Sequence, residues 1–141
     1  MSDVFLSEKT NVVGSAFNSS TSTVAQAALV SADSNGYDNA GTTDTTGAVA
    51  VAGASSGSVP RGFGSGGDKP PVAVSPVLVK VDSSQLSSSV GSYTVGVRVV
   101  PGASGKYAVM GSTGAACGVV LANDGTYVTI LVLPGYWPTV S

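Results

Sequence analysis

The second half of the chain alternates between hydrophobic residues and polar or small residues. This period of two residues is typical of β-strands that are buried on one face. In residues 72–82 the alternation places Val77, Val79 and Val81 on one face and polar or longer side chains on the other. Pro76 directly precedes this run and cannot donate a backbone hydrogen bond, which favours a strand at the edge of a sheet.

Further strands are predicted by the same alternation toward the C-terminus. Residues 93–99 put Tyr93, Val95, Val97 and Val99 on one face, and residues 106–111 read as a short strand. A hairpin follows, with strands at 115–122 and 126–133 joined by a turn at Asn123-Asp124-Gly125. Five strands separated by short turns predict a compact β-domain over residues 72–141, built as a small barrel or sandwich.

The first part of the chain, residues 1–71, reads as an extended Ser/Gly/Thr-rich arm and linker with short strands. Residues 24–32 fit either one strand or one short helical turn, and 48–53 fit a short strand. Between them lies a predicted loop with its best turn signal at Asn35-Gly36, and 55–71 form a Gly/Ser/Pro linker. The predicted fold class is therefore all-β.

Composition adds a reason to expect association. Only 10% of the residues are charged, against roughly 25% in an ordinary soluble domain. A β-domain of this size without disulfides or metal ions is marginally stable, so a homo-oligomer is expected. The net charge is −2 and the cations are scattered singly, which argues against a nucleic-acid partner. No segment reads as a signal peptide or as a membrane span, so we expect synthesis in a cytosol and no membrane partner.

The absence of histidine removes most candidate chemistry. It excludes Ser-His and Cys-His nucleophile pairs and His-ligated metal sites, and a single cysteine, Cys117, excludes thiolate metal cages. We expect Cys117 to be a small buried residue on a strand. The sequence therefore predicts no catalytic residue, no cofactor and no metal site, and hence a protein that is not an enzyme.

Three short motifs resemble functional patterns but lack the context that each needs. Residues 53–57 match the nucleophile elbow pattern, and 62–67 match the glycine pattern of dinucleotide-binding loops, yet neither precedes a predicted helix. Asp33, Asn35 and Asp44 occupy positions 1, 3 and 12 of a calcium loop, without flanking helices. An ordinary turn-rich or linker role is the expectation for all three.

Apolar side chains outside the predicted sheet are the candidates for partner binding. Tyr136 and Trp137, framed by prolines, either plug the domain's own interior or contact a neighbouring subunit. The full set of candidate partner-binding residues is Val4, Phe5, Leu6, Val12, Val13, Phe17, Phe63, Tyr136 and Trp137.

The predicted hairpin also carries a resemblance to a known family. The stretch "TGAACGVVLANDGTYVTILVLPG" resembles the C-terminal segment of the capsid decoration (cement) proteins of tailed bacteriophages, in which a "GxAxGVxL" strand and a "xVxVxLxG" strand close a small β-barrel. The matching positions are Gly114, Ala116, Gly118, Val119, Leu121, Val128, Ile130, Val132, Leu133 and Gly135.

This resemblance implies a structural protein of a virus head that binds the outer surface of the capsid. Its partner would be the major capsid protein, often contacted by trimers of the decoration protein at the junctions between capsid subunits. Extended arms of low charge suit such a role, since they add to neighbouring sheets through backbone hydrogen bonds. The alternative is a phage fibre or tail component, or an adhesin, that binds a host receptor or glycan.

Overall fold

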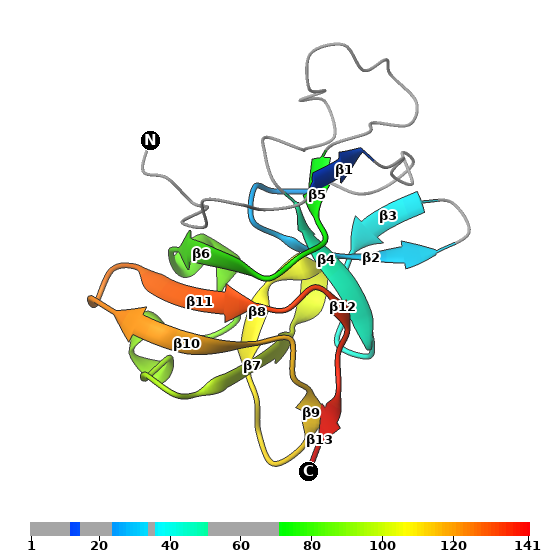
Figure 1. Cartoon of the computed structure of the whole chain (residues 1–141). Coiled ribbons are helices and arrows are strands. Elements are labelled where there is room, and N and C mark those ends of the chain that lie inside the picture. Colours follow the sequence, from blue (N-terminus) through cyan, green and yellow to red (C-terminus); the bar gives the residue numbers. More distant parts are fainter. Residues whose placement is uncertain (1–11, 15–23, 34–35, 51–70) are drawn as a thin grey trace.

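The computed structural model describes residues 12–14, 24–33, 36–50 and 71–141, and it shows an all-β protein (Figure 1). The predicted fold class is thereby confirmed. Helical structure in the described residues consists of three single turns of 3₁₀-helix: η1 (Ser83–Gln85), η2 (Val90–Ser92) and η3 (Ala103–Gly105).

Five strands from the second half of the chain form one antiparallel sheet. Their order across the sheet is β6 (Val77–Val81), β11 (Val128–Val132), β10 (Gly118–Asn123), β7 (Arg98–Pro101) and β8 (Tyr107–Val109). β6 lies at one edge, as Pro76 predicted. Among the described residues the sheet does not close on itself, so the predicted barrel is not confirmed; β6 and β8 are its first and last strands, and Leu86 forms an isolated bridge to Tyr107 of β8.

A second, six-stranded sheet is built mainly from the first half of the chain. Its order is β1 (Val12–Gly14), β5 (Pro71–Ala73), β4 (Thr46–Ala50), β2 (Leu29–Asp33) and β3 (Gly36–Asn39), and β12 (Gly135–Tyr136) also pairs with β4. The remaining two strands, β9 (Gly114–Ala115) and β13 (Thr139–Val140), pair with each other near the C-terminus (Figure 1).

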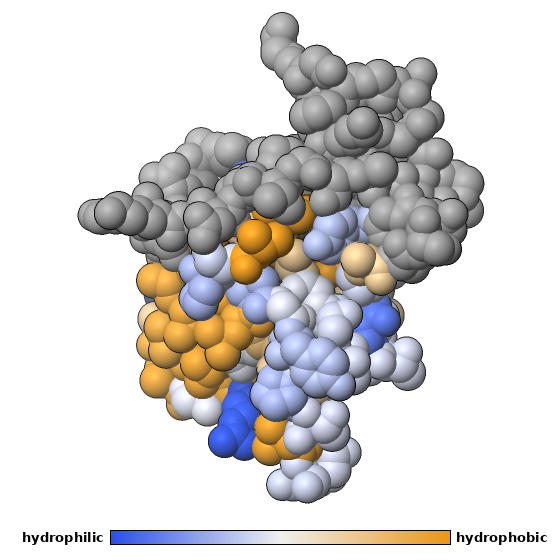
Figure 2. Space-filling model, turned by 45° about the vertical axis from the view of Figure 1, so that its right-hand side comes forward, coloured by the Kyte–Doolittle hydropathy of each residue, from blue (hydrophilic) through white to orange (hydrophobic). Residues whose placement is uncertain are grey.

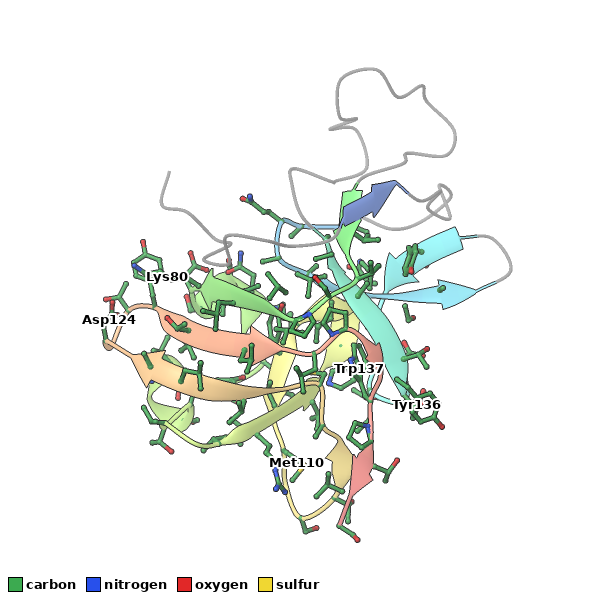
Figure 3. The ribbon with its side chains drawn as sticks, viewed as in Figure 1. Lys80, Met110, Asp124, Tyr136 and Trp137 are labelled. Atoms are coloured by element: carbon green, nitrogen blue, oxygen red, sulfur yellow. The ribbon has the colours of Figure 1, made fainter. Side chains whose placement is uncertain are left out.

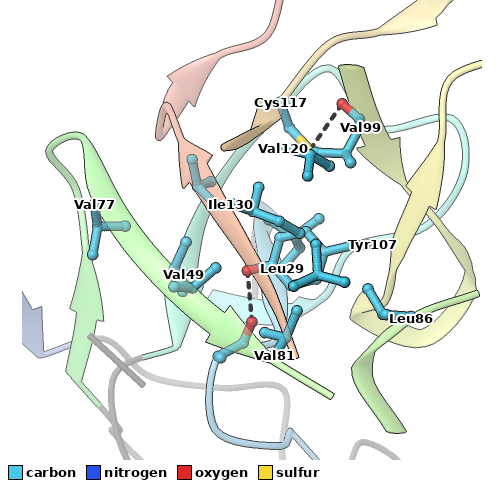
Figure 4. Packing of buried hydrophobic residues seen from close by; sticks show 14 of the residues in the cluster. Leu29, Val49, Val77, Val81, Leu86, Val99, Tyr107, Cys117, Val120 and Ile130 are labelled. Atoms are coloured by element: carbon cyan, nitrogen blue, oxygen red, sulfur yellow. Dashed lines mark hydrogen bonds between the residues drawn. The ribbon is translucent and has the colours of Figure 1, made fainter. Parts of the chain in front are cut away.

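One hydrophobic core joins the two sheets (Figure 4). Leu29 and Val49 come from the six-stranded sheet, and Val79, Val120 and Ile130 come from the five-stranded sheet; all five are fully buried. Full burial of one such side chain stabilises the fold by about 1.5–3 kcal/mol. Both sheets are therefore needed to cover the same core.

Residues 24–50 differ from the arm expected for them. β2 and β4 bury alternate residues on both faces: Leu29 and Val49 in the core above, and Val30 and Ala48 in a second cluster on the opposite face. A turn at Ala25–Ala28 precedes β2, so the strand interpretation of this segment holds from Leu29 onward. The predicted loop after it contains strand β3, which pairs with β2 as a hairpin. The arm stays a prediction for 1–11 and 15–23, which lie outside the described residues.

The predicted strand at 93–99 is wrong in its first half. β7 begins only at Arg98, because the chain turns at residues 94–97, where Val97 N–H donates to Thr94 O over 3.1 Å. Gly96 adopts a φ of +89°, which a residue with a side chain rarely tolerates. Val95 is consequently 68% exposed instead of lying beside buried Tyr93.

The predicted hairpin is confirmed as β10 and β11. Its turn is held by side chains: Asn123 Oδ1 accepts from Gly125 N–H at 2.8 Å, and Asp124 Oδ1 accepts from the N–H groups of Thr126 and Tyr127 at 2.8 and 2.7 Å. Gly125 supplies the positive φ, +91°, that the turn requires.

Candidate partner-binding surface

The five-stranded sheet has an apolar side that faces away from the core, which we call the outer face. Its central row follows from the strand register, which pairs Leu131 with Leu78 on one side and with Val119 on the other, and Val119 in turn with Arg98. The three apolar members of this row are half-buried. A sheet face that is only solvated normally alternates to polar residues, so three apolar neighbours in one row indicate a surface made for contact.

Two leucines extend this apolar area. Leu121 lies at the β-bulge between Val120 and Ala122, and Leu133 directly follows β11; each is 47% exposed. Figure 2 shows apolar residues gathered in a continuous orange area on the left of that view. Contiguous exposed apolar surface on a soluble protein marks sites of interaction.

Lys80, the lysine on the outer face, extends toward one end of this face. Lys80 Nζ lies over the ring of Tyr127, 4.9 Å from the ring centroid, beside the β10–β11 turn. Figure 3 shows Lys80 and Asp124 close together at that end. A cation over an aromatic ring is attracted by the electrons of the ring face. The middle of the outer face is left without this charge.

A groove of about 450 Å³ adjoins the outer face on the side of β9 and β13. Its lining residues are mostly small or apolar: Gly96, Arg98, Ala116, Gly118, Val119, Leu133, Pro138 and Val140. Gly118 is required here by packing, since a Cβ at this position would collide with the backbone oxygen of Leu131. The small residue at this position thus permits the close approach of β10 and β11.

Arg98 provides the charge of this groove. Its side chain is exposed, and within the described part of the chain it forms no ion pair or hydrogen bond. A guanidinium group has five donors and prefers carboxylate partners. The groove therefore combines an apolar wall with a guanidinium group that the described residues leave unpaired.

Tyr136 and Trp137 lie in different environments, although the sequence analysis gave the same two alternatives for both, a core plug or a subunit contact. Trp137 is fully buried, and its indole N–H donates to Leu133 O at 2.9 Å, so this side chain plugs the chain's own core. Tyr136 is 80% exposed. Successive residues of an extended segment point to opposite sides, which explains the split (Figure 3).

The other candidate residues from the sequence are not brought to the outer face. Val12 and Val13 belong to β1, which pairs with β5 in the six-stranded sheet. The remaining candidates lie outside the described residues: Val4, Phe5, Leu6, Phe17 and Phe63.

The outer face itself was missed, although the sequence carried its signal. The hairpin has hydrophobic residues at both alternating sets of positions, with Val119 and Leu131 opposite in phase to Val120 and Ile130. Such doubly apolar strands predict either burial on both faces or a partner on one of them.

Buried titratable groups serve the fold. Burial raises the pKa of Cys117 to about 12, and Sγ lies 3.4 Å from Val99 O as a weak donor. Burial likewise raises the pKa of Tyr107 well above its ordinary value, and its hydroxyl donates to Ala27 O at 2.7 Å. A thiol with so high a pKa stays protonated near neutral pH and is a poor nucleophile. Cys117 is buried as predicted, one residue before β10.

The segment that matches the calcium-loop pattern contains an ordinary turn at Asp44, as expected. Asp44 Oδ2 accepts from Gly41 N–H at 2.7 Å and from Ser31 Oγ at 2.9 Å, which closes a turn between β3 and β4. Among the described residues, no three His, Cys, Asp or Glu side chains gather to hold a metal ion. The motifs at 53–57 and 62–67 lie outside the described residues.

In the part of the chain that the structure describes, no helix has the length and apolar character needed to cross a membrane. Comparison with known proteins finds no matching family model, no similar curated protein and no similar solved structure.

Proposed function

We propose that this chain is a structural protein of a phage head, a capsid decoration protein that binds the outer surface of the major capsid protein shell and stabilises it. The observation that carries the proposal is the apolar outer face of the five-stranded sheet, together with the resemblance of hairpin β10–β11 to that family. The chain acts without a catalytic group, cofactor or metal ion.

The character of the outer face supports a permanent partner. Its central row, Leu78, Leu131 and Val119, would be desolvated on docking without any loss of hydrogen bonds, because these side chains carry no polar group. Obligate interfaces are more apolar than transient ones. A decoration protein, which stays on the shell once bound, needs a surface of this kind.

The edge of the six-stranded sheet offers a second type of contact. Among the described residues, β3 is the last strand on one side of that sheet. An extended segment of a capsid subunit can add to such an edge through backbone hydrogen bonds. The apolar outer face and this sheet edge together support binding to another β-rich assembly.

The proposal is tested by co-sedimentation of the purified chain with shells of the major capsid protein from the same genome. We expect saturable binding at a fixed ratio to capsid subunits, and a higher melting temperature of the shell. Leu121→Lys places a charge on the outer face and should weaken binding at least tenfold. Thr126→Lys adds the same charge at the exposed β10–β11 turn and is the matched control. Absence of binding by the folded wild-type chain would refute the proposal.

A glycan-binding role is the second candidate, favoured by one observation. Exposed Tyr136 pairs with Thr46, and beside them lies a hollow of about 280 Å³ lined by Ala32, Tyr37, Thr46, Gly47 and Gly135. Aromatic side chains beside a shallow hollow suit stacking against sugar rings. Screening on a glycan array distinguishes this role, and a Tyr136→Ala variant should then lose the signal.

A further inference from the structure

The groove beside β7 and β10 has two properties that a bound partner would have to match. Its wall is apolar, from Val119, Leu133 and Val140, while Arg98 contributes a cation that the described residues leave without an anionic partner. Its volume, about 450 Å³, lies within the range of roughly 300–1,000 Å³ that suits specific ligands. The complementary partner is an extended segment with large apolar side chains and a carboxylate.

The chain carries such a segment at its own N-terminus. Residues 3–8, "DVFLSE", place Val4, Phe5 and Leu6 between two carboxylates, Asp3 and Glu8. In an extended conformation Asp3 falls on the same side as Phe5, and Glu8 on the same side as Leu6. Either side of the segment therefore presents an apolar group together with an anion. The segments around the other two phenylalanines lack this combination, because Phe17 has no charged neighbour and Phe63 lies between glycines.

Geometry favours the segment of a second copy over the chain's own. Figure 1 shows β1, which begins at Val12, at the opposite end of the molecule from β13, whose Val140 lines the groove. Six to eight residues separate Val12 from Leu6 and Val4, and even a fully extended chain of that length spans only about 20–29 Å. This limited reach from β1 favours the groove of an adjacent molecule over the chain's own.

We propose that residues 3–8 of one copy bind in the groove of a second copy, with a carboxylate of Asp3 or Glu8 paired to Arg98. Each molecule then gives a segment at one end and receives one at the other. Such a head-to-tail contact generates a closed ring when the rotation between copies permits it. The inference concerns copies of this chain alone, so it does not depend on the proposed capsid partner.

The test is disulfide trapping between two single-cysteine additions to the full chain, carried by different molecules. Phe5→Cys and Leu133→Cys chains are mixed under mild oxidation, and buried Cys117 does not compete. We expect a covalent heterodimer on a non-reducing gel. Replacing the second chain by Leu121→Cys, on the outer face beyond the groove, is the control and should lower the yield at least tenfold.

Charge reversal provides an independent measurement, the mass of the chain in solution by light scattering. Arg98→Glu should convert oligomers into monomers, whereas Lys106→Glu, an equal change at an exposed position outside the groove, should leave the mass unchanged. Adding Asp3→Arg and Glu8→Arg to the Arg98→Glu chain should restore the oligomer. A monomeric wild-type chain, an unchanged mass of the Arg98→Glu variant, or a heterodimer yield no higher than that of the Leu121→Cys control would overturn the inference. Since no shell is present, none of these outcomes bears on capsid binding.

Discussion

The indole ring of Trp137 lies directly against Gly47, in the space that a Cβ atom at position 47 would occupy. The backbone holds this contact from both sides, because Trp137 N–H donates to Thr45 O at 2.6 Å and β12 pairs Gly135 with Gly47. A glycine on β4 thus makes room for the plug delivered by the last residues of the chain. The N-terminal and C-terminal parts of the chain are tied together at this point.

Gly47→Ala should therefore destabilise the protein. An added methyl group would overlap with the indole ring and with the backbone oxygen of Val30, and overpacking of this kind costs typically about 1–3 kcal/mol. The measurement is the free energy of unfolding from urea denaturation. Gly91→Ala is the matched control, since a Cβ at residue 91 meets no atom within 4 Å. Equal stability of the Gly47→Ala and Gly91→Ala variants would contradict the packing described here.

Removal of the plug should cost more. Trp137→Ala empties a fully buried site in the core, and truncation of a large buried aromatic side chain typically lowers the free energy of unfolding by about 3–5 kcal/mol. Tyr136→Ala, one residue earlier but 80% exposed, should change it by less than about 0.5 kcal/mol. Thermal and urea unfolding of the two variants, in parallel with the wild-type chain, measure the contrast. Similar losses in both would argue against the split between the two aromatic residues.

The strands that sequence alone predicted well are those whose alternation is uninterrupted. β6 and β11 each show one fully buried set of residues, and the Asn123-Asp124-Gly125 turn has a local hydrogen-bonding cause that a sequence can display. The strand prediction for the segment before β7 was wrong because Gly96 adopts a positive φ. Val95 therefore does not lie on the face that its spacing predicted.

The participation of β2 and β4 in the core could not be predicted from local pattern. Their apolar residues are mostly alanine and valine next to serine, threonine and glycine, which read equally well as an arm of low charge. They are buried because a distant sheet covers Leu29 and Val49 on one side. Whether Trp137 is buried in the core or contacts a neighbour could not be predicted for the same reason, because Gly47, ninety residues earlier, provides the space for its ring.

The Asp124 carboxylate should stabilise the hairpin turn in its ionised form. Hydrogen bonds from the backbone N–H of Tyr127, then from that of Thr126, lower the pKa of Asp124 below its usual value, with a further contribution from the charge of Lys80. The stabilisation is therefore complete above the ordinary aspartate pKa and is lost as the pH falls through the lowered folded-state pKa. Asp124→Ala should reduce stability at neutral pH, and the loss relative to wild type should shrink in acid.

Urea unfolding of both chains between about pH 2 and pH 7 measures this difference. Asp82→Ala, which removes a carboxylate that caps η1 through Ser84 N–H at 2.8 Å, reports on an acidic cap elsewhere in the fold. A stability difference between wild type and Asp124→Ala that is constant with pH would show that the charge of Asp124 is not involved.

Alkaline pH should unfold the protein through its buried thiol and phenol. Burial raises the pKa of Cys117 from about 9 to about 12, and burial, followed by the nearby Cys117 thiolate, raises that of Tyr107 above 10. Both groups keep their protons more tightly in the folded chain, so their contribution to stability is complete below the unfolded-state pKa values. It is lost as the pH rises from about 9 toward the folded-state values, because the unfolded chain releases these protons first. The free energy of unfolding should thus fall steeply above pH 9, and less steeply in a Cys117→Ala chain. The native thiol should also resist alkylation at pH 8 and react once urea unfolds the chain, whereas rapid labelling of the folded protein would contradict its burial.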